Sequence, residues 1–147
     1  MNVTIRKAER KDLPEIFALV CELAEYERLR HEVYATLDSY YEDYDEGWFK
    51  ALVAERNGQV IGTTIYYKTF STWKGKMIYL EDFVVTESER RNGVGKLLFE
   101  AFLDESKRLG AKMVRWQVID WNTPALNFYK KYPSVFTEQW IDAKIVF

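Results

Sequence analysis

The first third of the chain carries a short extended pattern and then two helical ones. Apolar and polar residues alternate over 3–5, which predicts a short strand. Asp12 is a candidate N-cap, and the apolar stripe at helical spacing over 13–24 predicts a helix behind it. Thr36 is the candidate cap of a second, shorter helix that runs toward residue 44. We therefore expect a strand and two helices before the main run of strands.

Three extended segments follow, at 48–56, 60–70 and 76–85. Asn57-Gly58 separates the first two and is the strongest hairpin signal in the chain, because both residue types tolerate the positive φ angles of a type I′ turn. The segment from Ser71 to Gly75 is the predicted loop between the second and third. These segments predict three consecutive antiparallel strands.

The last part of the chain predicts a crossover. Glycines at 93 and 95 open an amphipathic helix that Gly110 ends, and 113–118 is the next strand. A crossover of this length joins parallel strands. A short helix over 123–131 and a tail with strand character, 135–147, complete the pattern. We expect one domain over residues 1–147, of the α+β class, with one mixed, mostly antiparallel sheet of about seven strands and about four helices in three layers.

Composition excludes several classes of protein. The chain has 147 residues and a formal net charge of −2, which argues against a nucleic-acid partner because phosphate neutralisation needs a basic surplus. Its single cysteine, Cys21, allows no internal disulfide, and its single histidine, His31, argues against a metal site. No apolar run approaches the ~18 residues of a membrane span, and the first residues lack the apolar core of a signal peptide. We expect no membrane association and a cytoplasmic protein.

The loop after residue 85 is the first candidate for chemistry. Arg90-Arg91-Asn92-Gly93-Val94-Gly95-Lys96 combines basic residues with two glycines at a helix start, where unpaired N–H groups and the helix dipole attract anions. The glycine spacing does not match a nucleotide P-loop, and Leu98 stands where a dinucleotide fingerprint has its third glycine. Taken alone, the loop fits either an anion site or a tight turn with solvated charges.

Several motifs together resemble one family. Arg90-x-x-Gly93-x-Gly95 at a helix start is similar to the pyrophosphate-binding motif of the GNAT N-acetyltransferases. The closest resemblance is to the spermidine/spermine acetyltransferase branch and its thialysine-acetylating relatives. The stretches that carry it are Glu22-Leu23-Ala24-Glu25-Tyr26-Glu27, Ser71-Thr72-Trp73-Lys74-Gly75, Tyr79-Leu80-Glu81-Asp82-Phe83 and Trp121-Asn122-x-Pro124-x-x-Asn127-Phe128-Tyr129.

The resemblance implies acetyl-CoA as co-substrate and no metal. In the family, the strand before the glycine loop splays from its neighbour and the pantetheine inserts like an extra strand. The implied cofactor-binding residues are Phe83, Val84, Val85, Arg90, Arg91, Asn92, Gly93, Val94, Gly95, Lys96, Asn122, Pro124 and Ala125.

Two residues are candidates for catalysis. By resemblance, Glu81 faces the substrate amine and takes its proton, directly or through water. Strand alternation predicts that Glu81 and Asp82 point to opposite faces, so that only one of them reaches the site. Tyr129 is the candidate acid that protonates the departing thiolate. The alternatives from the residues alone are an exposed carboxylate pair and a packed aromatic side chain.

The substrate expected from the resemblance is the primary amine of a small basic molecule, a thialysine- or lysine-like amino acid or a polyamine, which attacks directly in a ternary complex. The implied substrate-binding residues are Tyr26, Glu27, Trp73, Glu81, Asp82, Arg115, Trp116, Gln117 and Trp140. Ser71 stands where the polyamine enzymes carry an acidic residue, which favours the lysine-like substrate. The alternatives are acetylation of a peptide or protein amine and a non-catalytic acetyl-CoA-binding regulatory domain. Resemblance also implies a homodimer.

Overall fold

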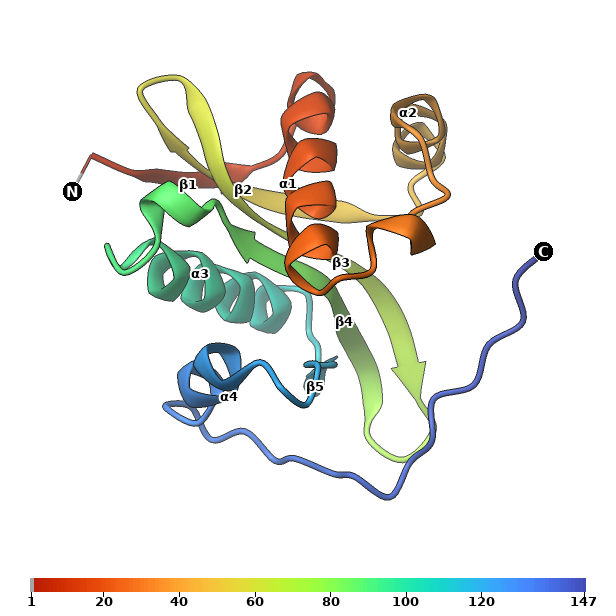
Figure 1. The fold of residues 1–147 in the computed structure, drawn as a ribbon. Helices are drawn as coiled ribbons and strands as arrows, with labels where there is room; N and C mark the ends of the chain where they lie inside the picture. Colours follow the sequence, from red (N-terminus) through yellow and green to blue (C-terminus); the bar gives the residue numbers. More distant parts are fainter. Residues whose placement is uncertain (1) are drawn as a thin grey trace. The chain divides into compact units, whose positions relative to one another are not determined.

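The structure is a computed structural model that describes residues 2–147 (Figure 1). The chain forms two compact units, one that ends at Gln117 and one that spans Val118–Phe147. The elements of the first unit are β1 (Thr4–Lys7), η1 (Arg10–Asp12), α1 (Leu13–Tyr26), η2 (Arg30–Glu32), α2 (Leu37–Asp45), β2 (Lys50–Arg56), β3 (Gln59–Ser71), β4 (Gly75–Val85), η3 (Glu87–Glu89), α3 (Val94–Arg108) and β5 (Met113–Trp116). The second unit contains α4 (Thr123–Tyr129).

One mixed sheet organises the first unit, with the strand order β1-β2-β3-β4-β5. The first three pairings are antiparallel and β4 pairs with β5 in parallel, as the crossover through α3 predicted. The described residues contain five strands, so the prediction of about seven is wrong. The two missing strands were expected in the tail over 135–147, which carries no strand. β-propensity alone does not make a strand when no neighbour pairs with its backbone.

The turn between β2 and β3 has the predicted type. Asn57 and Gly58 both have positive φ, 52° and 77°. These values match a type I′ turn, whose twist suits the flanking strands. The hairpin signal read from the sequence is therefore confirmed.

The two N-terminal helices begin in different ways. Thr36 caps α2 as predicted, because its hydroxyl accepts a hydrogen bond from the backbone N–H of Ser39. The Ser39 hydroxyl in turn accepts one from the backbone N–H of Thr36. Asp12 precedes α1 but makes no cap hydrogen bond to it. Its carboxylate instead accepts from the backbone N–H of Glu9 at 2.7 Å and from the Arg6 guanidinium at 2.8 Å. The prediction that Asp12 caps α1 is wrong because its side chain closes the preceding turn, η1.

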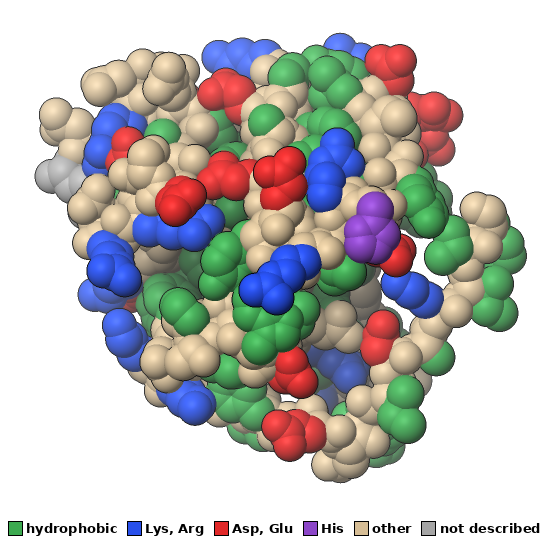
Figure 2. Space-filling model, viewed as in Figure 1, with side chains coloured by type: hydrophobic (Ala, Val, Ile, Leu, Met, Phe, Trp, Pro, Cys, Tyr) green, Lys and Arg blue, Asp and Glu red, His purple; other side chains and the backbone are tan. Residues whose placement is uncertain are grey.

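Helices cover both faces of the sheet, with α1 and α2 on one face and α3 on the other (Figure 1). Ile65 of β3 packs in the core with Leu13 and Ile16 of α1. Its neighbour Tyr66 points the other way and contacts Phe102 of α3, with ring centroids 5.5 Å apart. Strand alternation therefore assigns each residue of β3 to one of the two helical faces. On the surface, basic and acidic side chains are interspersed over the face drawn in Figure 2.

Candidate functional site

A β-bulge interrupts β4 where the candidate carboxylates lie. Leu80 pairs with Tyr66 of β3, and Asp82 pairs with the adjacent residue Ile65. Glu81 is therefore an extra residue in β4, with no partner of its own on β3. A bulge locally breaks the alternation of side chains and re-aims them. Because Ile65 faces α1, its partner Asp82 faces α1 as well.

Glu81 joins Asp82 on this face of the sheet. The Tyr67 hydroxyl donates a 2.7 Å hydrogen bond to Glu81 Oε1, and Tyr67 lies two residues from Ile65, on the α1 face. Both carboxylates also raise the pKa of Tyr40 on α2, after the larger effect of burial. The prediction that Glu81 and Asp82 point to opposite faces is therefore wrong, because it assumed a strand without a bulge.

Three acidic side chains gather at this point. Burial, followed by repulsion from Glu81 and Glu27, raises the pKa of Asp82 to about 7. Burial also raises the pKa of Glu27, which follows directly after α1. No Lys or Arg among residues 2–147 forms an ion pair with any of these three carboxylates. A region of negative charge that is partly withdrawn from water attracts a cationic group.

Aromatic rings flank these carboxylates. Tyr67 stacks on Tyr79 of β4, with centroids 5.6 Å apart. Burial and the hydrogen bond to Glu81 raise the pKa of Tyr67, which keeps its hydroxyl protonated as a donor. Tyr40 contacts Phe17 of α1 with centroids 4.8 Å apart. An ammonium group can lie against such ring faces as well as against carboxylates.

Beyond the bulge, the edge of β4 that faces away from β3 pairs with no strand of residues 2–147. β5 pairs with β4 only over Met77–Leu80, and its last residue, Trp116, lies opposite Leu80. From Glu81 to Val85, β4 pairs only with β3 among the strands of the described residues. Backbone N–H and C=O groups on such an edge can bind an extended ligand as an added strand.

The glycine loop lies directly after this open edge. Gly93 is the N-cap of α3 with φ 79°, and no side chain caps this helix. Arg91 also has positive φ, 68°, and Arg91, Asn92 and Gly93 are exposed. The first turn of α3 contains no acidic residue. An uncapped helix start with exposed basic residues and a glycine that permits close approach is suited to an anion.

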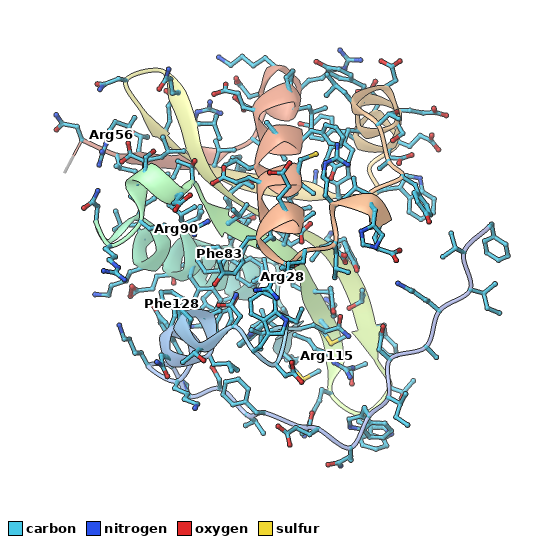
Figure 3. All side chains as sticks on the ribbon, viewed as in Figure 1. Arg28, Arg56, Phe83, Arg90, Arg115 and Phe128 are labelled. Atoms are coloured by element: carbon cyan, nitrogen blue, oxygen red, sulfur yellow. The ribbon has the colours of Figure 1, made fainter. Side chains whose placement is uncertain are left out.

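Arg90 points inward from this loop and supports it. Its Nε donates to the backbone oxygen of Val85 at 2.9 Å, and its guanidinium lies 5.5 Å from the centre of the Tyr26 ring. Glu22 of α1 accepts from the Thr86 hydroxyl at 3.0 Å and from the Glu87 backbone N–H at 2.9 Å. Figure 3 shows Arg90 and Phe83 beside the C-terminal end of α1. Contacts from α1 therefore fix the end of β4 and the start of the loop.

The other predicted residues of the first unit are more dispersed. Val94 is buried, so only its backbone is available to a ligand. Trp73 lies in the turn between β3 and β4 and is 83% exposed. Trp116 packs edge-on against Phe99 of α3, whereas its neighbour Arg115 is exposed. No group of His, Cys, Asp and Glu within residues 2–147 has the arrangement of a metal site.

The chain matches a known family over most of its length. The profile of the acetyltransferase (GNAT) family matches residues 13–132. The chain belongs to this family. It is 33% identical to the mouse (Mus musculus) thialysine N-epsilon-acetyltransferase over 139 residues, which cover 88% of this chain and 82% of the mouse protein. An L-ornithine N5-acetyltransferase of Arabidopsis thaliana is 35% identical over 82 residues, 55% of this chain and 36% of the plant protein.

A solved structure shows the same fold. The crystal structure of an aminoglycoside acetyltransferase from an uncultured soil metagenomic sample superposes with a TM-score of 0.81 at 19% identity. The match covers 99% of this chain and 97% of that protein. The family profile and the mouse relative confirm the predicted family. The solved structure confirms the α+β fold, although the number of strands was predicted wrongly.

No helix within residues 2–147 is long and apolar enough to cross a membrane.

The second unit of the acetyltransferase carries the remaining predicted residues. Asn122 caps α4, since its Oδ1 accepts from the backbone N–H of Ala125 at 3.2 Å. Pro124 lies in the first turn of this helix, and Tyr129 is its last residue, with its ring edge-on to Phe128. Trp140 lies in the extended tail and is 60% exposed.

Three residues of the acetyltransferase that contribute to the site were not singled out from the sequence. Tyr67 of β3 binds Glu81, the charges of Asp82 and Glu81 help to raise the pKa of Tyr40 on α2, and Glu22 holds the loop. The sequence signal for the tyrosines is weak, because aromatic residues in strands and helices are common in cores. Glu22 lies in one of the stretches that resemble the family, and its role depends on a contact with Glu87, 65 positions away in sequence.

Proposed function

We propose that this acetyltransferase transfers the acetyl group of acetyl-CoA to a primary amine of a small basic molecule, by direct attack in a ternary complex. The amine belongs to a lysine-like amino acid, such as thialysine or ornithine, or to a polyamine. Enzymes of the family use acetyl-CoA as co-substrate, and two relatives are named for acetylation of a side-chain nitrogen. The family match across both units supports one catalytic domain over residues 1–147. Resemblance supports a homodimer and a cytoplasmic location.

One observation carries the proposal: Glu27, Glu81 and Asp82, which form no ion pair within residues 2–147, lie beside the open edge of β4, and this edge leads into the uncapped start of α3. The proposed amine site, at the carboxylates, and the proposed thioester site, at the open edge, would therefore lie next to each other along β4. The pantetheine would lie along the backbone of Phe83–Val85, and the pyrophosphate would bind at the start of α3. The backbone and exposed side chains of 91–96 would hold the pyrophosphate, with Arg90 as the support of the loop.

The acidic face would bind the amine and remove its proton. An alkylamine with a pKa of about 10.4 arrives protonated, and its neutral form costs about 4.6 kcal/mol at pH 7. Glu81 is the proposed acceptor of this proton, directly or through water, while Tyr67 holds its carboxylate in place. Asp82, with its pKa near 7, is the second candidate for the same step. The neutral nitrogen then attacks the thioester carbonyl, and backbone N–H groups of the open edge stabilise the developing oxyanion.

Collapse of the tetrahedral adduct breaks the C–S bond and releases a thiolate. Tyr129 is the proposed donor of a proton to this sulfur, since a phenol of pKa about 10 can protonate a thiolate. Asn122, Pro124 and Ala125 at the start of α4 are proposed to contact the pantetheine arm. Tyr129→Phe should lower kcat at least tenfold with little change in the Km for acetyl-CoA. Tyr132→Phe, on the same unit, is the control, and an unchanged kcat in Tyr129→Phe would remove Tyr129 from the mechanism.

The test of the whole proposal is thiol release from acetyl-CoA with a panel of amines. The panel contains thialysine, lysine, ornithine, spermidine and a peptide with a free N-terminus. We expect turnover with the small amines and initial-velocity patterns of a ternary complex. Turnover with the peptide alone would favour acetylation of a protein amine. Binding of acetyl-CoA without turnover of any amine would mean a regulatory domain and would reject the proposal.

A further inference from the structure

Arg115 shares a face of the sheet with the carboxylates. On β5, Trp116 points to the α3 face, where it packs edge-on against Phe99 with centroids 5.7 Å apart. Strand alternation then directs Arg115 to the opposite face, the one covered by α1 and α2. Its direct partner on β4 is Tyr79, which stacks on Tyr67. Because in-register neighbours share a face, Arg115 lies on the same face as Tyr67, the tyrosine that holds Glu81, with Tyr79 of β4 between them.

The charge of Arg115 is not neutralised by the protein. It forms no ion pair with an Asp or Glu among residues 2–147, and it is exposed (Figure 3). One face of the sheet thus carries the guanidinium of Arg115 and, farther along β4, the carboxylates of Glu81 and Asp82, and none of these three groups forms an ion pair within residues 2–147. A guanidinium presents parallel N–H donors that match a carboxylate, and it repels an ammonium.

The spacing of these charges matches a small zwitterion. Arg115 lies opposite Tyr79, and Asp82 is three residues farther along β4. At about 3.3 Å per residue and about 4.8 Å between strands, their Cα atoms are roughly 10 Å apart. An extended lysine side chain places its terminal nitrogen about 6 Å from its α-carbon. Both residues lie on the same face of the sheet at this spacing, so their side chains can bind the two ends of one such molecule.

We propose that Arg115 binds the α-carboxylate of the substrate and thereby selects α,ω-diamino acids, acetylated on the terminal amine, over diamines and polyamines. This inference rests on the proposed function and narrows its substrate class. A diamine of the same length has no carboxylate for Arg115 to bind, and its second ammonium would lie near the positive charge of Arg115. Arg115 acts in binding and selection, and it takes no part in the proton transfers.

The test compares pairs of substrates that differ only in the carboxylate: lysine with cadaverine, and ornithine with putrescine. We expect wild-type kcat/Km to favour the amino acid in each pair. Arg115→Met should lower this preference by at least 30-fold, mainly through the Km of the amino acid. Arg115→Lys should retain part of it, and Arg115→Glu should reverse it in favour of the diamines. Lys112→Met removes a nearby exposed positive charge before β5 and should leave the preference unchanged.

The outcomes separate this inference from the proposed function. If wild-type protein acetylates lysine and cadaverine equally well, or if Arg115→Met lowers both rates by the same factor, Arg115 does not select the carboxylate, while the acetyltransferase activity stands. If no amine in either pair is acetylated but thialysine or spermidine is, the inference about Arg115 is wrong and the acetyltransferase activity stands; if none of these amines is acetylated, both proposals are wrong. The thermal midpoint of each variant shows whether a lost rate reflects lost folding.

Discussion

The Tyr67 hydroxyl donates a 2.7 Å hydrogen bond to Glu81, the one residue that the bulge in β4 adds to the strand. The bulge leaves Glu81 without a backbone pairing partner on β3, and the side chain of Tyr67, on the same strand β3, fixes its carboxylate instead. A charged acceptor makes this hydrogen bond stronger than one between neutral groups. The pair therefore holds Glu81 in one orientation at the proposed amine site.

Removal of this hydroxyl should disorient Glu81. Tyr67→Phe keeps the ring and its stacking on Tyr79, and it loses only the hydrogen bond. A hydrogen bond to a charged group contributes about 1.5–3 kcal/mol, so kcat/Km for the amine should fall roughly 10- to 100-fold. Steady-state thiol release measures this. Tyr34→Phe, at a tyrosine that is 70% exposed, is the matched control, and an equal loss in both variants would contradict the role of Tyr67.

Asp82 should reduce the stability of the protein above neutral pH. Its pKa is about 7 in the folded protein and 3.8 without the surroundings of the fold, so the folded state binds this proton more tightly than the unfolded chain. Wild-type stability therefore falls as pH rises from about 4 to about 7. Asp82→Asn does not titrate, so its free energy of unfolding relative to wild type should increase by about 2–4 kcal/mol between pH 4 and pH 8.

Urea unfolding at pH 4.5, 6 and 8 measures this difference. Asp104→Asn, on an exposed position of α3, is the control and should differ from wild type by the same small amount at each pH. A difference between Asp82→Asn and wild type that does not grow with pH would show that the folded protein does not hold the proton of Asp82.

The same carboxyl should shape the pH dependence of catalysis. If ionised Asp82 is needed to bind the ammonium or to take its proton, kcat/Km rises through an inflection near pH 7. Asp82→Asn should lower the rate and remove this inflection, whereas Glu81→Gln should lower the rate and keep an inflection that lies at lower pH, because it removes the repulsion that helps to raise the pKa of Asp82. An inflection near pH 7 that persists in Asp82→Asn belongs to another group.

Parts of the fold and of the candidate site were predictable from sequence. These are the features that depend only on residues close together in the chain. The turn at Asn57-Gly58 and the cap at Thr36 were predicted correctly, because both follow from residues a few positions apart. The glycines that open α3 were predicted for the same reason. The faces of Glu81 and Asp82 were predicted wrongly, because a bulge is a property of the pairing between two strands and leaves no fixed mark in one of them.

In the tail the error is of another kind, because the sequence predicted strands that the structure does not contain. Residues 135–147 contain enough β-branched and aromatic residues to resemble a strand, but Val135, Ile141 and Ile145 are each more than 80% exposed. A strand requires a neighbour whose backbone groups are available, and no sequence pattern in the tail specifies one. Propensity was thus informative for β2 to β5, the four strands whose partners follow from two hairpins and a crossover, and misleading in the tail, where no such connection exists.

Glu22 should control the affinity for CoA without touching it. Its carboxylate accepts from the Thr86 hydroxyl and from the Glu87 backbone N–H, which fixes the chain just before the loop. Glu22→Gln weakens these contacts, and the loop must then be ordered when the ligand binds. We expect a 5- to 10-fold higher Kd for CoA by calorimetry, about 1–1.4 kcal/mol. Glu25→Gln, on the exposed side of α1, should leave the Kd unchanged, and an unchanged Kd in Glu22→Gln would mean that the loop is rigid without this contact.

Gly93 should be required for the approach of the pyrophosphate to the start of α3. Its φ of 79° disfavours other residues, so Gly93→Val should lose about 1–2 kcal/mol of stability whatever binds there. Gly47→Val is the matched control, because Gly47 also has positive φ, 83°, and a Cβ there has no atom within 4 Å. Both variants should lose similar stability, but only Gly93→Val should weaken CoA binding, by at least 30-fold, because its side chain would occupy the position proposed for the phosphate oxygens. Equal CoA affinity in the two variants would show that the loop at 90–95 is a turn and that the pyrophosphate binds elsewhere.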